Sequence, residues 1–145
     1  MRVRLSTRVM LLCFLAFHKG KCVGTVVCKM GDHRQTFRGY IAMLVVIKPY
    51  RGRGIASELV TRAIKAMMES GCEEVTLEAE VSNKGALALY GRLGFIRAKR
   101  LYHYYLNGMD AFRLKLLFPK PRVPQIPSQV QTQQEYETFP RPRVP

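Results

Sequence analysis

The sequence predicts an α/β domain, in which a mixed β-sheet is flanked by helices. Apolar and alternating segments follow one another in the order strand–strand–strand–helix–strand–helix–strand–strand. This order indicates a mixed sheet covered by helices. The chain has 145 residues, of which 48% are hydrophobic, so it is long enough for one domain with its own core.

The first elements are predicted to be two strands joined by a tight turn. Residues 11–17 form a short apolar run, and residues 22–30 follow after the turn sequence His18-Lys19-Gly20-Lys21. Three arginines precede the first run, a pattern that also imitates a secretory signal or an organelle transit peptide. We favour the strand, because the run is short and no A-x-A-like cleavage site follows it.

The middle of the chain predicts a strand, a helix, a strand and a second helix. Residues 40–47 are almost all apolar, which indicates a strand buried on both faces. Apolar residues then recur at helical spacing from residue 55 to residue 68, and Gly71 is placed as a C-terminal cap. Residues 74–81 alternate and put polar side chains on one face, and residues 83–93 predict the second helix.

Two closing strands are predicted over residues 99–106 and 109–118. They flank Asn107-Gly108, which is typical of a type I′ hairpin. We therefore expect the domain to span residues 11–118, after an atypical basic start over residues 1–10. Residues 119–145 hold seven of the eight prolines and many glutamines, which predicts a disordered, extended tail. The tail is either a basic docking peptide or an inert extension, and we favour the inert extension.

Composition narrows the classes of function. The chain has 24 Lys and Arg against 10 Asp and Glu, a formal charge of +14 that favours polyanionic partners. The four cysteines include no C-x-x-C pair, and the three histidines lack metal-site spacing, so we expect reduced thiols and no metal. No apolar run approaches the ~20 residues of a membrane-spanning helix, so no membrane span is expected.

The glycine-rich segment Arg51-Gly52-Arg53-Gly54-Ile55-Ala56 lies between the predicted strand 40–47 and the helix that follows. A helix start offers free N–H groups and a positive dipole end, and glycines let the backbone approach an anion closely. The segment lacks the Gly-Lys-Ser/Thr of a Walker loop. By itself it could equally be a basic surface loop.

A second motif, one strand later, favours the phosphate-binding interpretation. Residues 83–95 read N-x-x-A-x-x-L-Y-x-x-x-G-F, and Asn83 and Tyr90 share a helix face two turns apart. Together the two motifs resemble the GNAT superfamily of acetyl-coenzyme A-dependent N-acetyltransferases. Residues 39–44, 77–81 and 99–108 are similar more specifically to the catalytic subunits of N-terminal acetyltransferase C (NatC) complexes. The resemblance covers about residues 11–118 and implies an acyl-CoA N-acyltransferase fold.

The resemblance implies acetyl-CoA as co-substrate and a set of cofactor-binding residues. The pantetheine arm would lie along the strand at Met43, Leu44, Val45 and Val46, and the pyrophosphate would lie on the amides of Arg51, Gly52, Arg53, Gly54, Ile55 and Ala56. Asn83 and Tyr90 complete the expected cofactor site.

The resemblance also implies catalytic roles. A peptide α-amine has a pKa of roughly 8 and must lose a proton before it attacks a thioester, so a general base is useful. Glu78 matches the family's base position, and Glu80 is the second candidate. Tyr90 would protonate the departing thiolate, and a backbone N–H near Leu44 would stabilise the oxyanion. The peptide groove would be lined by Tyr40, Tyr104 and Tyr105. The alternative is that Glu78 and Glu80 form an ordinary solvated strand face.

The implied function is N-alpha-acetylation of proteins whose N-terminus is Met followed by a hydrophobic residue. The implied partners are nascent polypeptide N-termini, NatC-type auxiliary subunits and the ribosome, in the cytoplasm, with organelle targeting as the alternative. The family's usual first strand and helices are absent before residue 11, so we expect an N-terminally truncated form. The alternative is therefore an impaired form that binds CoA or the ribosome without turnover. A lysine acetyltransferase and a nucleic-acid-binding protein are weaker interpretations, the latter resting on charge alone.

Overall fold

Six strands form one sheet in the computed structural model, which describes residues 9–120. Strands β1 (Met10–His18), β2 (Lys21–His33) and β3 (Thr36–Val46) are antiparallel neighbours. Strands β4 (Glu74–Glu80), β6 (Ala111–Leu117) and β5 (Ile96–Leu101) follow, giving the order β1-β2-β3-β4-β6-β5. The predicted mixed sheet flanked by helices is thus confirmed. The predicted basic start, up to residue 8, and the predicted tail, from residue 121, lie outside the described residues.

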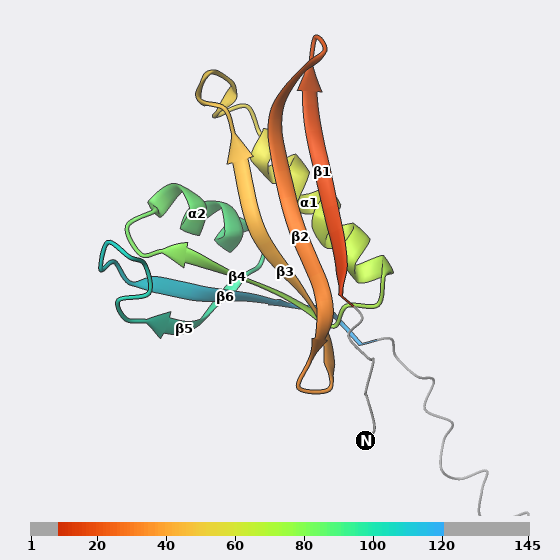
Figure 1. Cartoon of the computed structure of the whole chain (residues 1–145), viewed down its shortest axis with the longest axis vertical. Coiled ribbons are helices and arrows are strands. Elements are labelled where there is room, and N and C mark those ends of the chain that lie inside the picture. The colour runs from red at the N-terminus through yellow and green to blue at the C-terminus, as the bar shows by residue number, and fades with distance from the viewer. Residues whose placement is uncertain (1–8, 121–145) are drawn as a thin grey trace, which may run out of the picture.

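The helices lie where the apolar periodicity predicts them. Helix α1 (Ile55–Glu69) packs along the first three strands, while α2 (Lys84–Arg92) lies beside β4 (Figure 1). A short 3-10 helix, η1 (Lys48–Tyr50), precedes α1. Gly71 has a positive φ of 93° just beyond the end of α1, as expected of a C-terminal cap. Asn83 caps α2, because its side chain accepts a hydrogen bond from the N–H of Ala86.

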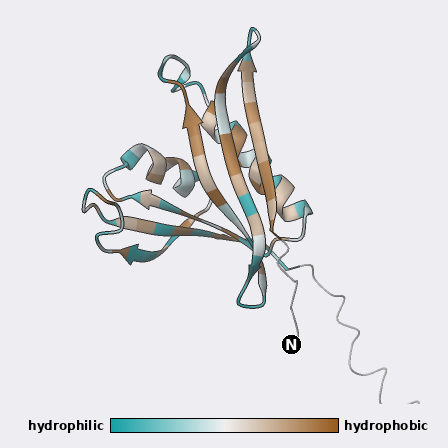
Figure 2. Ribbon diagram, in the orientation of Figure 1, coloured by the Kyte–Doolittle hydropathy of each residue, from teal (hydrophilic) through white to brown (hydrophobic). Residues whose placement is uncertain are grey.

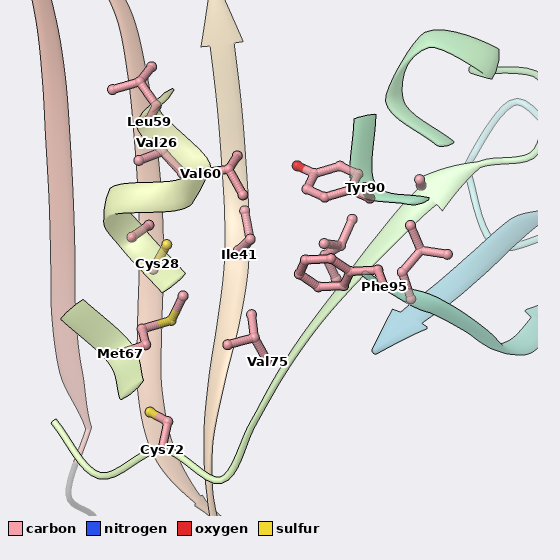
Figure 3. Packing of buried hydrophobic residues seen from close by; sticks show 14 of the residues in the cluster. Val26, Cys28, Ile41, Leu59, Val60, Met67, Cys72, Val75, Tyr90 and Phe95 are labelled. Carbon is pink, nitrogen blue, oxygen red and sulfur yellow. The ribbon is translucent and has the colours of Figure 1, made fainter. Parts of the chain in front are cut away.

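The core forms between α1 and the sheet and continues beneath α2. Met67 of α1 is completely buried, and the side chains of Cys28, Cys72 and Val75 lie around it (Figure 3). Tyr90 and Phe95 extend this cluster toward α2, with their rings edge-on at 5.3 Å. Figure 2 shows that the strands are largely apolar (brown), with both buried and exposed positions among them. No helix within residues 9–120 is long and apolar enough to cross a membrane.

The two halves of the sheet separate between β3 and β4. These parallel strands pair only at Arg38–Glu74, Gly39–Val75 and Tyr40–Thr76. Beyond Tyr40 the strands diverge, as Figure 1 shows. The register of β3 also slips against β2, since Val27 pairs with Met43 whereas Cys28 pairs with Ile41. Ala42 is therefore the extra residue of a β-bulge at the point where the strands diverge.

The prediction that strand 40–47 is buried on both faces is wrong. Ile41 and Val46 are buried, but Met43 and Val45 are 44% and 42% exposed. Their side chains alternate with that of the buried Val46, so they lie on the opposite face of β3, which is left open. The strand is nevertheless apolar throughout, so its uncovered side is an apolar surface beside the gap between β3 and β4.

The closing hairpin also differs from its prediction. β5 ends at Leu101, and residues 102–110 form a loop instead of continuing to a two-residue turn. Only Gly108 of the Asn107-Gly108 pair has a positive φ, whereas a type I′ turn needs two. Asp110 holds the loop, because its carboxylate accepts from the side chain of Arg100 and from the N–H of His103. Tyr104 and Tyr105 thus lie on a loop and not on a strand.

A test of this fold is the substitution Gly39→Ala at the β3–β4 junction. A Cβ at Gly39 would collide with Sδ of the buried Met67 and lie 3.2 Å from Cγ2 of Val75. We expect the free energy of unfolding to fall by about 1–3 kcal/mol, the usual cost of overpacking a core. Urea denaturation measures this change. The matched control is Gly91→Ala in α2, where a Cβ meets no heavy atom within 4 Å and stability should stay equal or rise. Equal stability of the Gly39→Ala variant and the wild type would contradict the packing described.

Candidate active site

A large cavity opens where β3 ends and α1 begins. Its volume is about 750 Å³, and it lies between the end of β3, the loop that follows, the first turn of α1 and one side of α2. Gly52 and Gly54 have φ values of 75° and 81°, so the loop adopts a left-handed backbone that favours glycine. The open N-terminus of α1 supplies N–H groups that are not bonded within the helix. The cavity therefore combines an apolar strand surface with an anion-binding helix end.

Most of the predicted cofactor residues line this large cavity. They are Leu44, Val45, Val46, Arg51, Gly52, Gly54, Ile55, Ala56 and Asn83. The lining also includes residues that the sequence analysis did not assign, of which Tyr50, Ser57 and Arg92 carry polar groups. Arg92 lies in the last turn of α2 and adds a positive charge to the side of the cavity opposite α1.

The two arginines of the glycine-rich loop have different positions. The Nε of Arg51 donates to the carbonyl oxygen of Val46 at 2.8 Å, so this side chain ties the loop back to the end of β3. Arg53 lies over the ring of Tyr50 and lines a separate groove between β1 and α1. The structure therefore does not bring the Arg53 side chain into the large cavity, although its backbone belongs to the loop.

A small cavity adjoins the large one in the gap between β3 and β4. It has a volume of about 270 Å³ and shares Leu44, Asn83 and Ala86 with the large cavity. Its remaining lining comes from both diverging strands, from Tyr90 of α2 and from Tyr105 of the closing loop. Met43, Glu78 and Glu80 line it as well. The gap thus brings the predicted base, its alternative and the predicted acid to one place.

Glu78 is bound on both oxygens and is nearly buried. Its side chain is 8% exposed, so the interpretation as an ordinary solvated strand face does not apply to it. Oε2 accepts a hydrogen bond from the hydroxyl of Tyr40 at 2.5 Å. Oε1 accepts from Nε and Nη2 of Arg113, each at 3.3 Å. Burial and, next, donation to this carboxylate raise the pKa of Tyr40 well above its ordinary value.

Tyr90 lies in an apolar environment with its hydroxyl directed toward β3 (Figure 3). The residue is 4% exposed, and burial raises the pKa of its phenol to about 12, with a smaller contribution from Cys28. The phenol is therefore neutral at physiological pH and carries a proton that it can donate.

The other predicted substrate residues divide into two groups. Glu80 and Tyr105 line the small cavity, and Glu80 accepts from the hydroxyl of Ser82 at 2.7 Å. Burial, followed by the nearby Tyr104, raises the pKa of the Tyr105 phenol. Tyr104 packs edge-on against Tyr105 at 5.1 Å and is 47% exposed, so it lies at the outer rim. Tyr40 does not line the small cavity, but its hydroxyl is hydrogen-bonded to Glu78, which does.

Arg113 is the main residue of the site that the sequence analysis missed. It lies in the middle of β6, and the strand register places it directly opposite Glu78. The only signal in the sequence was a pair of basic residues, Arg113 and Lys115, in the otherwise apolar run of residues 111–117, and this pattern does not distinguish one from the other. No group of three or more His, Cys, Asp or Glu side chains suited to a metal ion occurs in the part of the chain that the structure describes.

Comparison with known proteins identifies the family. The model of the acetyltransferase (GNAT) family matches residues 5–95. The chain belongs to the GNAT acetyltransferase family. This membership confirms the resemblance drawn from the two motifs, and GNAT enzymes use acetyl-CoA as the acetyl donor.

Individual relatives refine the GNAT assignment. The chain is 99% identical to N-alpha-acetyltransferase MAK3 of Arabidopsis thaliana over 134 residues, which are 92% of this chain and 70% of the relative. It is 58% identical to N-alpha-acetyltransferase 30 of Xenopus laevis over 106 residues, 72% of this chain and 39% of that protein. The solved NatC complex bound to Gag peptide and CoA matches with a TM-score of 0.67 and 52% identity, over 68% of this chain and 62% of that chain. These relatives confirm the expected NatC-type N-alpha-acetyltransferase.

The GNAT co-substrate fits the two cavities by its chemistry. Acetyl-CoA carries phosphates at one end and a thioester at the other, joined by an extended pantetheine arm. The glycine loop and the first turn of α1 would hold the phosphates, and the uncovered edge of β3 would hold the arm. The small cavity, with Glu78 and Tyr90, then lies at the reactive end.

A test of this arrangement is the substitution Gly54→Val. The new side chain would strain the left-handed backbone at the start of α1 and stand where phosphate oxygens must approach the amides. We expect the Kd for CoA, measured by isothermal titration calorimetry, to rise at least ~10-fold, which is about 1.4 kcal/mol.

The matched control for Gly54→Val is Gly20→Val. Gly20 also has a positive φ, of 76°, and open space around a Cβ, but it lies in the β1–β2 turn and lines neither cavity. Its variant should keep the wild-type Kd. Equal weakening in both variants would mean that backbone strain alone, and not the phosphate site, explains the loss.

Proposed function

We propose that this chain transfers the acetyl group of acetyl-CoA to the N-terminal amine of proteins, with Glu78 as general base and Tyr90 as general acid. The observation that carries this proposal is the small cavity, in which a buried carboxylate and a buried neutral phenol meet beside the open edge of β3. Acetyl-CoA supplies an activated acyl group when it is bound. The chain has to bind the amine, remove its proton and return a proton to the leaving sulfur.

The base has to act on an amine that is mostly protonated at neutral pH. An N-terminal α-amine has a pKa of roughly 8, so a carboxylate that accepts its proton, directly or through a water, increases the reactive fraction. Glu78 lines the cavity from β4 with its carboxylate already fixed by two partners. Glu80 lies two residues along the same strand and adds a negative charge that attracts the α-ammonium group.

The acid has to reach the leaving sulfur from the other side of the gap. Tyr90 projects from α2, which forms one side of the large cavity, and it lines the small cavity beside Asn83 and Ala86. Its phenol is protonated at neutral pH, so a proton is available there for the departing thiolate. The apolar surroundings of Tyr90 also exclude water.

The preferred substrates are proposed to be N-termini with Met followed by a hydrophobic residue. Support comes from the resemblance to NatC-type catalytic subunits and from Tyr105, which places an aromatic side chain on the small cavity. Tyr40 and Tyr104 are proposed to contribute to the same groove, from β3 and from the outer rim. Auxiliary subunits are proposed as partners because the solved NatC structure is a complex.

The ribosome and a cytoplasmic location are proposed on the basis of the reaction and of charge. Nascent chains present their N-termini at the ribosome, and the chain's formal charge is +14. Strand β5 exposes Arg97, Lys99 and Arg100 along one edge of the sheet, which suits contact with RNA phosphates. Sedimentation with ribosomes at two salt concentrations tests the first proposal, and imaging of a fusion with a free N-terminus tests the second.

The direct test of the reaction is mass spectrometry of a Met-Leu peptide incubated with the full chain, acetyl-CoA and NatC-type auxiliary subunits. A product acetylated on the α-amine is expected. A thermal shift with acetyl-CoA but no acetylated peptide would instead favour a protein that binds CoA without turnover. Acetylation only at an internal lysine would overturn the assignment of substrate class.

Two substitutions test the catalytic roles. Glu78→Gln removes the proton acceptor and Tyr90→Phe removes the proton donor, so each should lower kcat at least ~10²-fold. The matched controls are Glu74→Gln, on the same strand outside the cavities, and Tyr102→Phe, an exposed tyrosine of the closing loop. Both controls should keep wild-type kcat. Wild-type turnover in the Glu78 or Tyr90 variant would remove that residue from the mechanism.

The pH dependence of the reaction follows from the raised pKa of Tyr90. A pKa of about 12 keeps the donor protonated throughout the working range, so alkaline pH removes no proton from it below that value. The rate should therefore rise with pH as the α-amine loses its proton near pH ~8, and then level off without a decline up to about pH 10. Stopped-time assays across this range measure the profile. A decline centred below pH ~10 that disappears in Tyr90→Phe would contradict the proposed environment of Tyr90.

A further inference from the structure

The Glu78–Arg113 pair joins β4 to β6 beside the small cavity, which Glu78 lines and Arg113 does not. Glu78 on β4 and Arg113 on β6 are direct partners in the strand register. Two guanidinium nitrogens, Nε and Nη2, lie 3.3 Å from the same carboxylate oxygen, Oε1. The Glu78 side chain is 8% exposed and that of Arg113 is 37% exposed, so the carboxylate is buried while the guanidinium keeps contact with solvent.

The two carboxylate oxygens of Glu78 accept different numbers of hydrogen bonds. A carboxylate offers about four lone-pair positions in all. The two donors of Arg113 occupy Oε1, and the hydroxyl of Tyr40 occupies one position on Oε2. The acceptor position that remains is on Oε2. Glu78 lines the small cavity, so this position is the one available to an amine or a water there.

The buried carboxylate also needs a positive partner. Moving a carboxylate out of water costs free energy unless a nearby positive charge and hydrogen bonds compensate. Three other ionisable groups lie near Glu78, namely Tyr40 from β3, Tyr105 from the closing loop and Glu80 on its own strand. None of these three is a cation, so Arg113 supplies the positive charge among them.

We propose that Arg113 is a positioning residue for acetyl transfer: its guanidinium holds Oε1 of Glu78 and thereby presents Oε2 as the proton acceptor. The inference rests on the proposed function, because it assigns the atom through which Glu78 acts as base. Arg113 forms no part of the lining of the small cavity, so it acts through Glu78. Its removal should affect the chemical step and leave the binding of acetyl-CoA intact.

The fold provides a matched control pair. Lys115 on β6 and Glu74 on β4 form an ion pair at 3.4 Å between the same two strands, with both side chains partly buried. Neither residue lines a cavity described above. A variant without the Lys115 charge therefore measures how much loss of a β4–β6 ion pair outside the cavities changes kcat through structure alone.

The experiment is a double-mutant cycle on kcat and KM with the full chain, a Met-Leu peptide and acetyl-CoA. Arg113→Gln should lower kcat at least ~10-fold and leave the KM for acetyl-CoA within ~2-fold of wild type. Arg113→Lys keeps the positive charge but loses the contact of two guanidinium nitrogens with Oε1, so its kcat should lie between those of Arg113→Gln and the wild type. Lys115→Gln should keep wild-type kcat. In the Glu78→Gln background, Arg113→Gln should change kcat by less than ~2-fold, because the carboxylate through which it acts is gone.

Several results would overturn the positioning role. One is a full ~10-fold effect of Arg113→Gln in the Glu78→Gln background, and another is an equal loss in Lys115→Gln. Absence of turnover in the wild type, by contrast, contradicts the proposed function, and a structural measurement then decides on Arg113. In crystal structures, Arg113→Gln should displace the Glu78 carboxylate and Lys115→Gln should not. An undisplaced carboxylate in Arg113→Gln would overturn the inference.

Discussion

The parallel ladder between β3 and β4 stops after three residue pairs, and the rest of the molecule is arranged around that interruption. Had the two strands remained paired, the apolar edge of β3 would be covered and no cavity could form at the centre of the sheet. Because they diverge, β3 leaves an open strand edge, β4 presents Glu78, and α2 places Tyr90 beside the gap. The glycine loop and α1 then extend the same opening toward an anion-binding helix end.

The interruption is stabilised by packing on one side and by polar contacts on the other. Met67 packs beneath the junction at Gly39, where the absence of a side chain lets the helix approach the sheet. Tyr40 is the last residue of β3 that pairs with β4. Its hydroxyl donates to Glu78 on β4, so it connects the two strands at the point where their ladder ends. Arg113 fixes the same carboxylate from β6. A buried carboxylate is costly unless it is paired, and here the pairing joins three adjacent strands.

The sequence was most informative where a pattern depends on neighbours along the chain. The periodicity of α1, the alternation of β4 and the C-terminal cap at Gly71 are local, and they were predicted correctly. The open face of β3 could not be predicted, because an apolar strand looks the same whether protein or a ligand covers it. Arg113 was missed because its partner Glu78 is 35 residues away and is identified only by the strand register. The Asn107-Gly108 turn was misassigned because Asp110, two residues after Gly108, accepts hydrogen bonds from Arg100 and His103, and the turn pattern gives no sign of these bonds.

The short junction also has a consequence for how the molecule fluctuates. With only three ladder pairs between them, the two units β1–β3 with α1 and β4–β6 with α2 are held together mainly by the side chains of their shared core. A ligand that lies along β3 and contacts α2 touches both units. It therefore acts as a cross-link between them, and amide hydrogen exchange should slow on both sides of the gap when it binds, including in strands that the ligand never touches. The co-substrate of such an enzyme is thus also a structural part of its working form.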